Sequence, residues 1–245
     1  MYKSFSFSRN PMSARLMMIG LGLAGTTTEP SAAQQTPAAE APPAGELQAY
    51  AVDREQSSLV VVTHKAGLLS FLGHEHAIIP EGWSVALCLG DPVPTTSRGS
   101  LVIETGSLVI DSDSARALAG LGDGPGADDV IEIQRTLLNA DHLAADAYPT
   151  ITLDIDSTER TEDEALVTHG RLTLRGITRA VAIPVVAESV ATGTIRLSGA
   201  LRIRQSDFGL TPESTAGMVK VADDVDLRFE LMAATTGRPC PPGPQ

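Results

Sequence analysis

Two histidines separated by a single residue are the side chains best suited to metal chemistry. His74 and His76 flank Glu75. In an extended segment, residues two apart point to the same side, so both imidazoles could face one ion. A zinc site needs three or four ligands, and Glu75 would point the opposite way. Candidates for a further ligand lie elsewhere in the chain: His64, His142 and His169.

The histidine pair leaves two interpretations open. It could bind a divalent ion, a haem or a ligand head group, or it could be a structural turn with hydrogen-bonded imidazoles. The spacing is not the His-Glu-x-x-His of zinc proteases. The sequence therefore predicts a metal role for His74 and His76 only as one of these alternatives.

No set of residues typical of an enzyme accompanies the histidines. Asp207-Phe208-Gly209 lacks the catalytic and nucleotide-binding segments of a kinase, and no Gly-x-Ser-x-Gly hydrolase motif occurs. The stretch Gly120–Gly126 has no following Gly-Lys-Ser/Thr and so is not a phosphate loop. We therefore expect a protein that is not an enzyme and has no certain cofactor.

The chain has 245 residues and a formal net charge of −12. This charge argues against nucleic acid and against electrostatic attachment to anionic membranes. Of the two cysteines, Cys88 lies in an expected strand and Cys240 in a Pro-rich tail. Because such a tail is not held in place, we expect these two cysteines not to pair.

The N-terminus has the pattern of an export signal. Arg9 and Arg15 precede an apolar run, Leu16–Ala24, and small residues follow at 31–33. The run is too short to span a bilayer comfortably, so no stable membrane span is expected after its removal. We expect a periplasmic or secreted protein. Its expected parts are a signal peptide (1–33), a disordered Ala/Pro linker (34–46), one domain (47–235) and a disordered tail (236–245).

Apolar and polar residues alternate along eight segments. Residues two apart on a strand share one face, so each segment has one apolar and one polar face. Eight such segments joined by turns predict an all-β fold, either a sandwich or a closed barrel of eight antiparallel strands. The segments are 57–65, 82–89, 99–110, 150–157, 165–175, 179–188, 193–204 and 224–232.

One α-helix is expected between the strands. Val130, Ile133 and Leu137 recur at spacings of three and four, which gives one apolar stripe. Asp128 and Asp129 suit the positive end of the helix dipole.

The residues that alternate toward the interior either fill the barrel or line a cavity, since eight strands allow both. For Trp83, core packing and cavity lining are both open. We expect ten residues to face inward: Leu59, Val61, Trp83, Val85, Leu172, Leu174, Leu197, Leu201, Leu227 and Phe229.

Four segments together resemble the YceI-like family. The segments, in chain order, are Asp146-Ala147-Tyr148-Pro149-Thr150-Ile151-Thr152-Leu153, Gly170-Arg171-Leu172-Thr173-Leu174-Arg175-Gly176-Ile177-Thr178-Arg179, Arg204-Gln205-Ser206-Asp207-Phe208-Gly209-Leu210 and Val219-Lys220-Val221-Ala222-Asp223-Asp224-Val225. The resemblance spans roughly residues 50 to 232. In the first half, Lys65 stands where many members carry a histidine.

The resemblance implies a lipocalin-like barrel with one packed helix that encloses an apolar channel. It implies a bound polyisoprenoid lipid or isoprenoid quinone, and a homodimer stays open. We therefore expect an exported lipid-binding protein without catalysis, with the ten inward-facing residues as its lipid-binding residues. Two alternatives remain: a metal- or haem-associated periplasmic protein that uses His74 and His76, and a structural or stress accessory domain with a filled core.

Overall fold

The computed structural model describes residues 47–67, 74–90, 97–212, 214–215 and 219–241. The predicted signal peptide (1–33) and linker (34–46) lie outside these residues, as does Gly73, which precedes the histidine pair.

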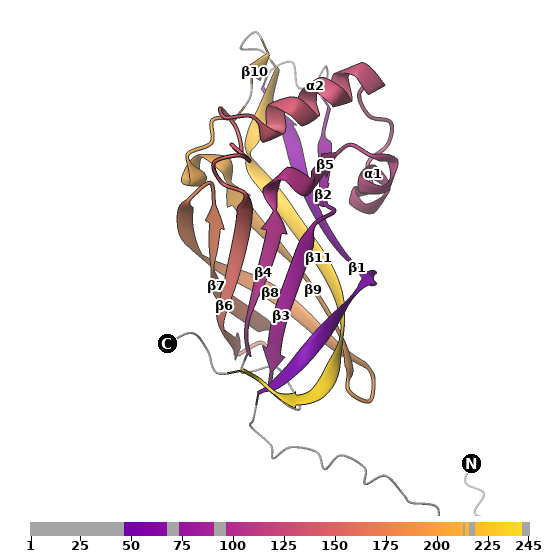
Figure 1. Cartoon of the computed structure of the whole chain (residues 1–245), viewed down its shortest axis with the longest axis vertical. Helices are drawn as coiled ribbons and strands as arrows, with labels where there is room; N and C mark the ends of the chain where they lie inside the picture. Colours follow the sequence, from indigo (N-terminus) through magenta and orange to yellow (C-terminus); the bar gives the residue numbers. More distant parts are fainter. Residues whose placement is uncertain (1–46, 68–73, 91–96, 213, 216–218, 242–245) are drawn as a thin grey trace, which may run out of the picture. The chain divides into compact units, whose positions relative to one another are not determined.

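Eight strands form a closed antiparallel barrel (Figure 1). Each strand pairs with the next in the order given below, and the last pairs with the first, so the sheet has no free edge along the ring. Every predicted segment overlaps one of these strands, which confirms the predicted fold. The strands in order around the barrel are β1 (Gln48–Ala66), β3 (Trp83–Leu89), β4 (Ser97–Glu104), β6 (Thr150–Arg160), β7 (Leu166–Leu174), β8 (Ile177–Ala191), β9 (Thr194–Arg204) and β11 (Val219–Pro239).

Three short strands add to this ring. β2 (His76–Pro80) pairs with β1, β5 (Leu108–Ile110) pairs with β2, and β10 (Ser214–Thr215) pairs with β11. β5 lies in the predicted segment 99–110, which a 3₁₀ turn at Thr105–Ser107 divides. β1 pairs with β3 at its start and with β2 near its end, so two strands share that edge of β1.

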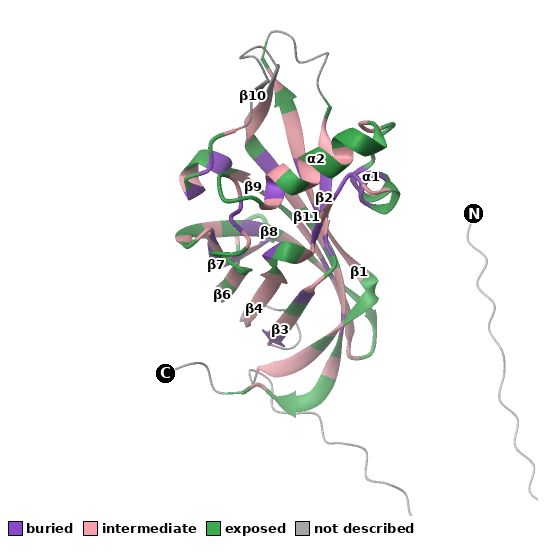
Figure 2. Ribbon diagram, turned by 45° about the horizontal axis from the view of Figure 1, so that its top comes forward, coloured by how far each residue is buried: buried purple, intermediate pink, exposed green. Residues whose placement is uncertain are grey.

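The predicted helix is α2 (Ala127–Leu138), which lies across one end of the barrel (Figure 1). Its apolar stripe faces inward as expected: Leu137 is buried, and Val130 and Ile133 pack against the barrel core. Ile131, on the opposite side, is 68% exposed. Figure 2 shows the outer side of α2 as exposed.

A second helix, α1 (Asp113–Ala119), was not predicted. The Ser112 hydroxyl accepts a hydrogen bond from the Ala115 amide at its start, and Gly120 ends it in the left-handed conformation. Ala115 and Ala119 pack on the outer face of β1, over Val60 and Val62. The barrel therefore carries two helices, one across its end and one on its wall.

The turn between β7 and β8 brings together two of the segments that carry the family resemblance. Arg175 and Gly176 both have positive φ, the conformation of a two-residue hairpin turn. A Cβ at Gly176 would lie 2.8 Å from a ring carbon of Tyr148. The Tyr148 ring thus packs directly on the glycine, and a side chain at this position would clash with the ring.

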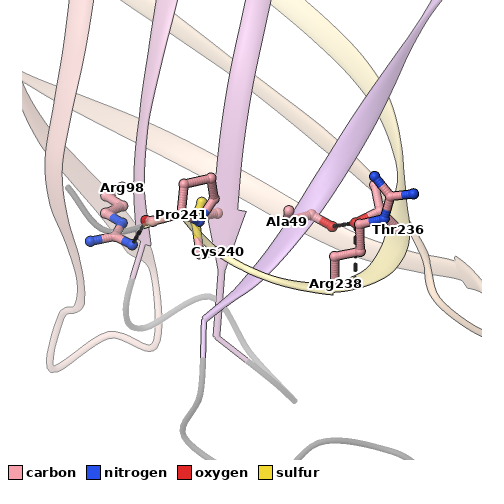
Figure 3. Close-up of a disulfide and its surroundings, with 7 residues drawn as sticks. Ala49, Arg98, Thr236, Arg238, Cys240 and Pro241 are labelled. Atoms are coloured by element: carbon pink, nitrogen blue, oxygen red, sulfur yellow. Dashed lines mark hydrogen bonds between the residues drawn. A yellow bond between two sulfur atoms is a disulfide. The ribbon is translucent and has the colours of Figure 1, made fainter. Parts of the chain in front are cut away.

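The predicted disordered tail is wrong for residues 236–240. β11 continues to Pro239, and the Thr236 hydroxyl donates to the Ala49 carbonyl (Figure 3). Cys240 forms a disulfide with Cys88 on β3, with 5.8 Å between the two Cα atoms. The prediction that these cysteines do not pair is therefore also wrong. Pro-rich composition suggested disorder, but pairing with β1 holds the segment in place.

Candidate functional site

The interior of the barrel is hollow. Leu59, Val85, Leu201 and Leu227 point inward, yet each is only half-buried. A close-packed face is fully buried, as the outer face of β1 is at Val60 and Val62 beneath α1. The interior is therefore not a filled core, because it contains two apolar cavities.

The larger cavity, the helix-end chamber, has a volume of about 190 Å³. Leu137 of α2 and Leu143, which follows that helix, close its end together with Leu210. Among its few polar neighbours, Gln205 is buried and its amide donates to the Ala222 carbonyl at 2.9 Å. Its other lining residues are Leu59, Val60, Val61, Thr63, Ile78, Pro80, Leu101, Ile103, Leu108, His142, Ile151, Leu153, Leu172, Leu174, Ile183, Leu201, Ile203, Val225, Leu227, Arg228 and Phe229.

The smaller cavity, the disulfide-end chamber, has a volume of about 100 Å³. Three buried hydroxyls on its wall bond to each other in a chain: Ser97 to Thr158, and Thr158 to Thr168 at 2.9 Å. Because these hydroxyls bond to one another, they present little unpaired polarity to the cavity. The remaining lining residues are apolar: Leu59, Val85, Leu87, Leu89, Leu101, Leu153, Ile155, Leu166, Ile183, Val185, Leu197, Phe229 and Leu231.

The two chambers bring together all but one of the ten residues predicted to face inward. Leu59 and Phe229 line both chambers. Val85 and Leu197 line only the disulfide-end chamber. The other five line only the helix-end chamber: Val61, Leu172, Leu174, Leu201 and Leu227.

Trp83 is the exception. It is buried but lines neither chamber. The Arg54 guanidinium lies over its ring, 5.0 Å from the ring centre, and donates to the Glu81 carbonyl at 2.6 Å. Of the two interpretations of this residue, the structure therefore favours packing over cavity lining.

Several lining residues were missed, and most of them carried the same signal. Leu101 and Leu153 sit in predicted strands, and Leu231 continues the alternation of Leu227 and Phe229. Extending each alternating pattern to the end of its strand would have found them. Leu143 and Leu210 lie outside the strands, so no periodicity points to them.

His76, one member of the histidine pair, is part of a polar network beside α1. The His76 Nδ1 donates to Asp111 at 2.6 Å, and Arg116 donates to the same carboxylate at 2.6 Å and to the Glu75 carbonyl at 3.0 Å. Burial by itself raises the pKa of Asp111, but its hydrogen bonds to His76, the Ala77 amide and Arg116 outweigh burial and lower it. This arrangement favours the structural interpretation of His76.

His64, a candidate third ligand, joins a second network. Its Nδ1 lies 2.9 Å from Glu75 and its Nε2 lies 2.9 Å from Asp226. The hydrogen bond to Glu75, aided by the one to Asp226, raises the pKa of His64 above its ordinary value of 6.5. Arg202 contacts both oxygens of Asp226 and lowers the pKa of that carboxyl to about 2.

Within the described ranges, no group of three or more His, Cys, Asp or Glu side chains could hold a metal ion. His74 is exposed. The metal role of His74 and His76 stays a prediction. The same ranges contain no helix that is long and apolar enough to span a membrane.

A closed eight-stranded barrel with an apolar, hollow interior defines the class of lipocalin-like proteins. Within this class, the chain belongs to the YceI-like domain family, whose model matches residues 50–233. The match includes all four segments that carried the resemblance. It confirms the family predicted from the sequence.

Solved structures support the fold. BcnA of Burkholderia cenocepacia is 20% identical with a TM-score of 0.56, and the match covers 75% of this chain and all of that one. A polyisoprenoid binding domain from Saccharophagus degradans, implicated in plant cell wall breakdown, is 14% identical with a TM-score of 0.51, over 77% of this chain and 99% of that domain. No curated protein matches the chain.

Proposed function

We propose that the protein binds one apolar polyisoprenoid or isoprenoid-quinone-like chain inside the barrel and performs no catalysis. The observation that carries the proposal is the pair of apolar chambers, whose walls come from all eight barrel strands. Membership of the YceI-like family and the likeness to a polyisoprenoid binding domain support it. Burial of apolar surface, at about 25 cal/mol per Å², supplies the affinity.

The polar residues of the helix-end chamber give this binding its direction. Thr63, His142 and Gln205 contribute to its wall, whereas the hydroxyls of the disulfide-end chamber already bond to one another. A polar head group is best accommodated beside polar side chains, because its burial among apolar ones alone costs free energy. We therefore expect the head group at the helix end and the apolar tail toward the disulfide end.

The deciding experiment is solvent extraction of the purified full chain followed by mass spectrometry. We expect recovery of a polyisoprenoid or quinone and uptake of a labelled polyprenol by the stripped protein. Recovery of no lipid, together with no uptake of the polyprenol, would contradict the proposal.

A pair of glutamine variants provides the matched comparison. Leu201→Gln places an amide in the helix-end chamber, so uptake of the polyprenol should fall by about tenfold or more. Val186, on the outer side of β8, is 57% exposed. Val186→Gln should leave uptake unchanged, and an equal loss in both variants would indicate general damage instead of a lost binding site.

We further propose that the protein is exported to the periplasm or secreted. The signal-like N-terminus and the disulfide support this, because disulfides persist in oxidising compartments. Expression of the full chain in a bacterium, with mass spectrometry of the recovered protein, should show loss of residues 1–33. An intact N-terminus and reduced cysteines would contradict export. A homodimer stays a prediction that light scattering can test.

A further inference from the structure

One layer of side chains lies between the two chambers. Five residues line both cavities and come from five different strands, β1, β4, β6, β8 and β11. Leu101 pairs directly with Leu153 across β4 and β6, and Leu59 pairs with Phe229 across β1 and β11. The fifth is Ile183 of β8. An apolar chain that runs from one chamber into the other must pass between these five side chains.

Phe229 is the largest member of the layer, and its ring has a particular resting place. Its direct partner on β9 is Gly199, and a Cβ at Gly199 would lie 2.7 Å from the ring Cζ. The same Cβ would lie 2.5 Å from the Pro184 carbonyl oxygen. A glycine at this position therefore gives the ring of Phe229 a place against the wall that any other residue would occupy.

Phe229 also has room to move. Like Leu59, Leu101 and Leu153, it is only half-buried and borders empty volume in both chambers, and it carries the only ring of the layer. A close-packed side chain changes rotamer only by displacing its neighbours. A ring with cavities on both sides instead swings into free volume, so its rotation meets little resistance.

We propose that Phe229 is a gate that determines the length of apolar chain the barrel accepts. The helix-end chamber takes the part of the ligand next to the head group, and a longer chain enters the disulfide-end chamber only after the ring leaves Gly199. This inference rests on the proposed function, since it concerns the same cavity. It adds a residue that selects among ligands of one class, linear isoprenoids of different length.

The first test measures dissociation constants of the full chain for linear isoprenoid alcohols: geraniol, farnesol, geranylgeraniol and solanesol. In the wild type, each added isoprene unit should raise affinity by more than about tenfold until the helix-end chamber is full, and by clearly less beyond that length. In Phe229→Ala the large gain should continue to longer alcohols. We call the chain length at which the gain per isoprene unit falls the break. Phe229→Leu, a milder change, should shift this break to longer alcohols by a smaller amount than Phe229→Ala.

Two neighbouring valines of β8 supply the control. Val185 lines only the disulfide-end chamber, and Val186 faces outward. Val185→Gln should weaken binding of the longest alcohol by about tenfold and leave geraniol unaffected. Val186→Gln should change neither.

Methyl NMR locates the ligand without any substitution. Geraniol should shift the methyl signals of Leu201 and Leu227, which line only the helix-end chamber, and not those of Leu197 and Leu231, which line only the other. Solanesol should shift both sets.

The outcomes separate the two proposals. If Phe229→Ala binds the alcohols but keeps the wild-type break, or if geraniol shifts both sets of methyl signals in the wild type, the gate is wrong and the proposed function stands. If the wild type binds none of the alcohols, the proposed function fails and the gate fails with it.

Discussion

Asp111 shows how strongly one residue can depend on distant parts of the chain. Its side chain is fully buried and accepts hydrogen bonds from His76, the Ala77 amide and Arg116. A buried carboxylate is stable only when it is paired and hydrogen-bonded. Asp111 thus fastens α1 to β2, and the histidine segment is held between them.

Arg116→Ala should destabilise the protein by about 3–5 kcal/mol, because it leaves the buried Asp111 carboxylate without its charged partner. Urea denaturation measures the loss. Arg135, an exposed arginine of α2, is the control, and Arg135→Ala should cost less than about 0.5 kcal/mol. Similar losses in both variants would show that the Asp111 pair contributes no special stability.

His64 should make the stability depend on pH. Because folding raises its pKa above 6.5, its contribution is fully present below about pH 6.5 and is lost as the pH rises through the higher value in the folded protein. His64→Gln should therefore cost more stability at about pH 5.5 than at about pH 8.5. Asp226, with a pKa of about 2, stays ionised throughout this range.

Urea midpoints of wild type and variant at the two pH values give the comparison. His169, which pairs with Glu159 on the exposed surface, is the control, because such pairs contribute little. A cost of His64→Gln that is the same at both pH values, or larger at the higher one, would contradict the role assigned to the two carboxylates.

Cavity-lining residues could be predicted from the sequence, whereas the polar networks could not. Leu172 and Leu227 follow a local alternation that states which face each side chain occupies. Asp111 and His76 are 35 residues apart, and nothing near either residue indicates its partner. Trp83 fits the alternation but lines no chamber, because Arg54 from another strand covers its ring.

Among the helices and strands, the length of each element decided whether it could be predicted from the sequence. The long barrel strands and α2 carry enough periods of their pattern to be recognised. β2 has five residues and α1 has seven, too few for a clear period. The end of β11 was missed for another reason: residues 236–239 are held by pairing with β1, a partner far away in sequence.

Only the side of α2 that faces the barrel should contribute to stability. Leu137→Ala removes a buried side chain that closes the helix-end chamber and should cost about 2–4 kcal/mol. Ile131→Ala, on the exposed side of the same helix, should change stability by less than about 0.5 kcal/mol. Thermal or urea unfolding of both variants tests this, and comparable costs would mean that the helix does not pack as described.

For the whole molecule, the disulfide should contribute to the free energy of unfolding of the barrel. The bond joins Cys88 and Cys240, 152 residues apart, and so restricts nearly the whole barrel domain when it unfolds. Beside it, the Arg98 side chain donates to the Pro241 carbonyl (Figure 3). The Cys240 amide donates to the Leu47 carbonyl. Together with the disulfide, these contacts join the ends of β1, β3, β4 and β11.

Replacing both cysteines, Cys88→Ser with Cys240→Ser, should lower the free energy of unfolding by about 3–5 kcal/mol, because the unfolded chain regains the freedom of a long loop. Guanidinium denaturation with and without a reductant measures it. The reductant should destabilise the wild type and leave the double variant unchanged. A wild type insensitive to reductant would show that the bond adds no stability.

The hydrogen bond between Cys240 and Leu47 has a topological consequence. The two ends of the barrel domain lie side by side, with 3.0 Å between the Cys240 nitrogen and the Leu47 oxygen. A short linker between them would close the domain into a circle, and the turn between Thr161 and Ala165 would offer a place for new ends. The barrel therefore does not depend on the order in which its strands are synthesised. A circular permutant should keep both chambers.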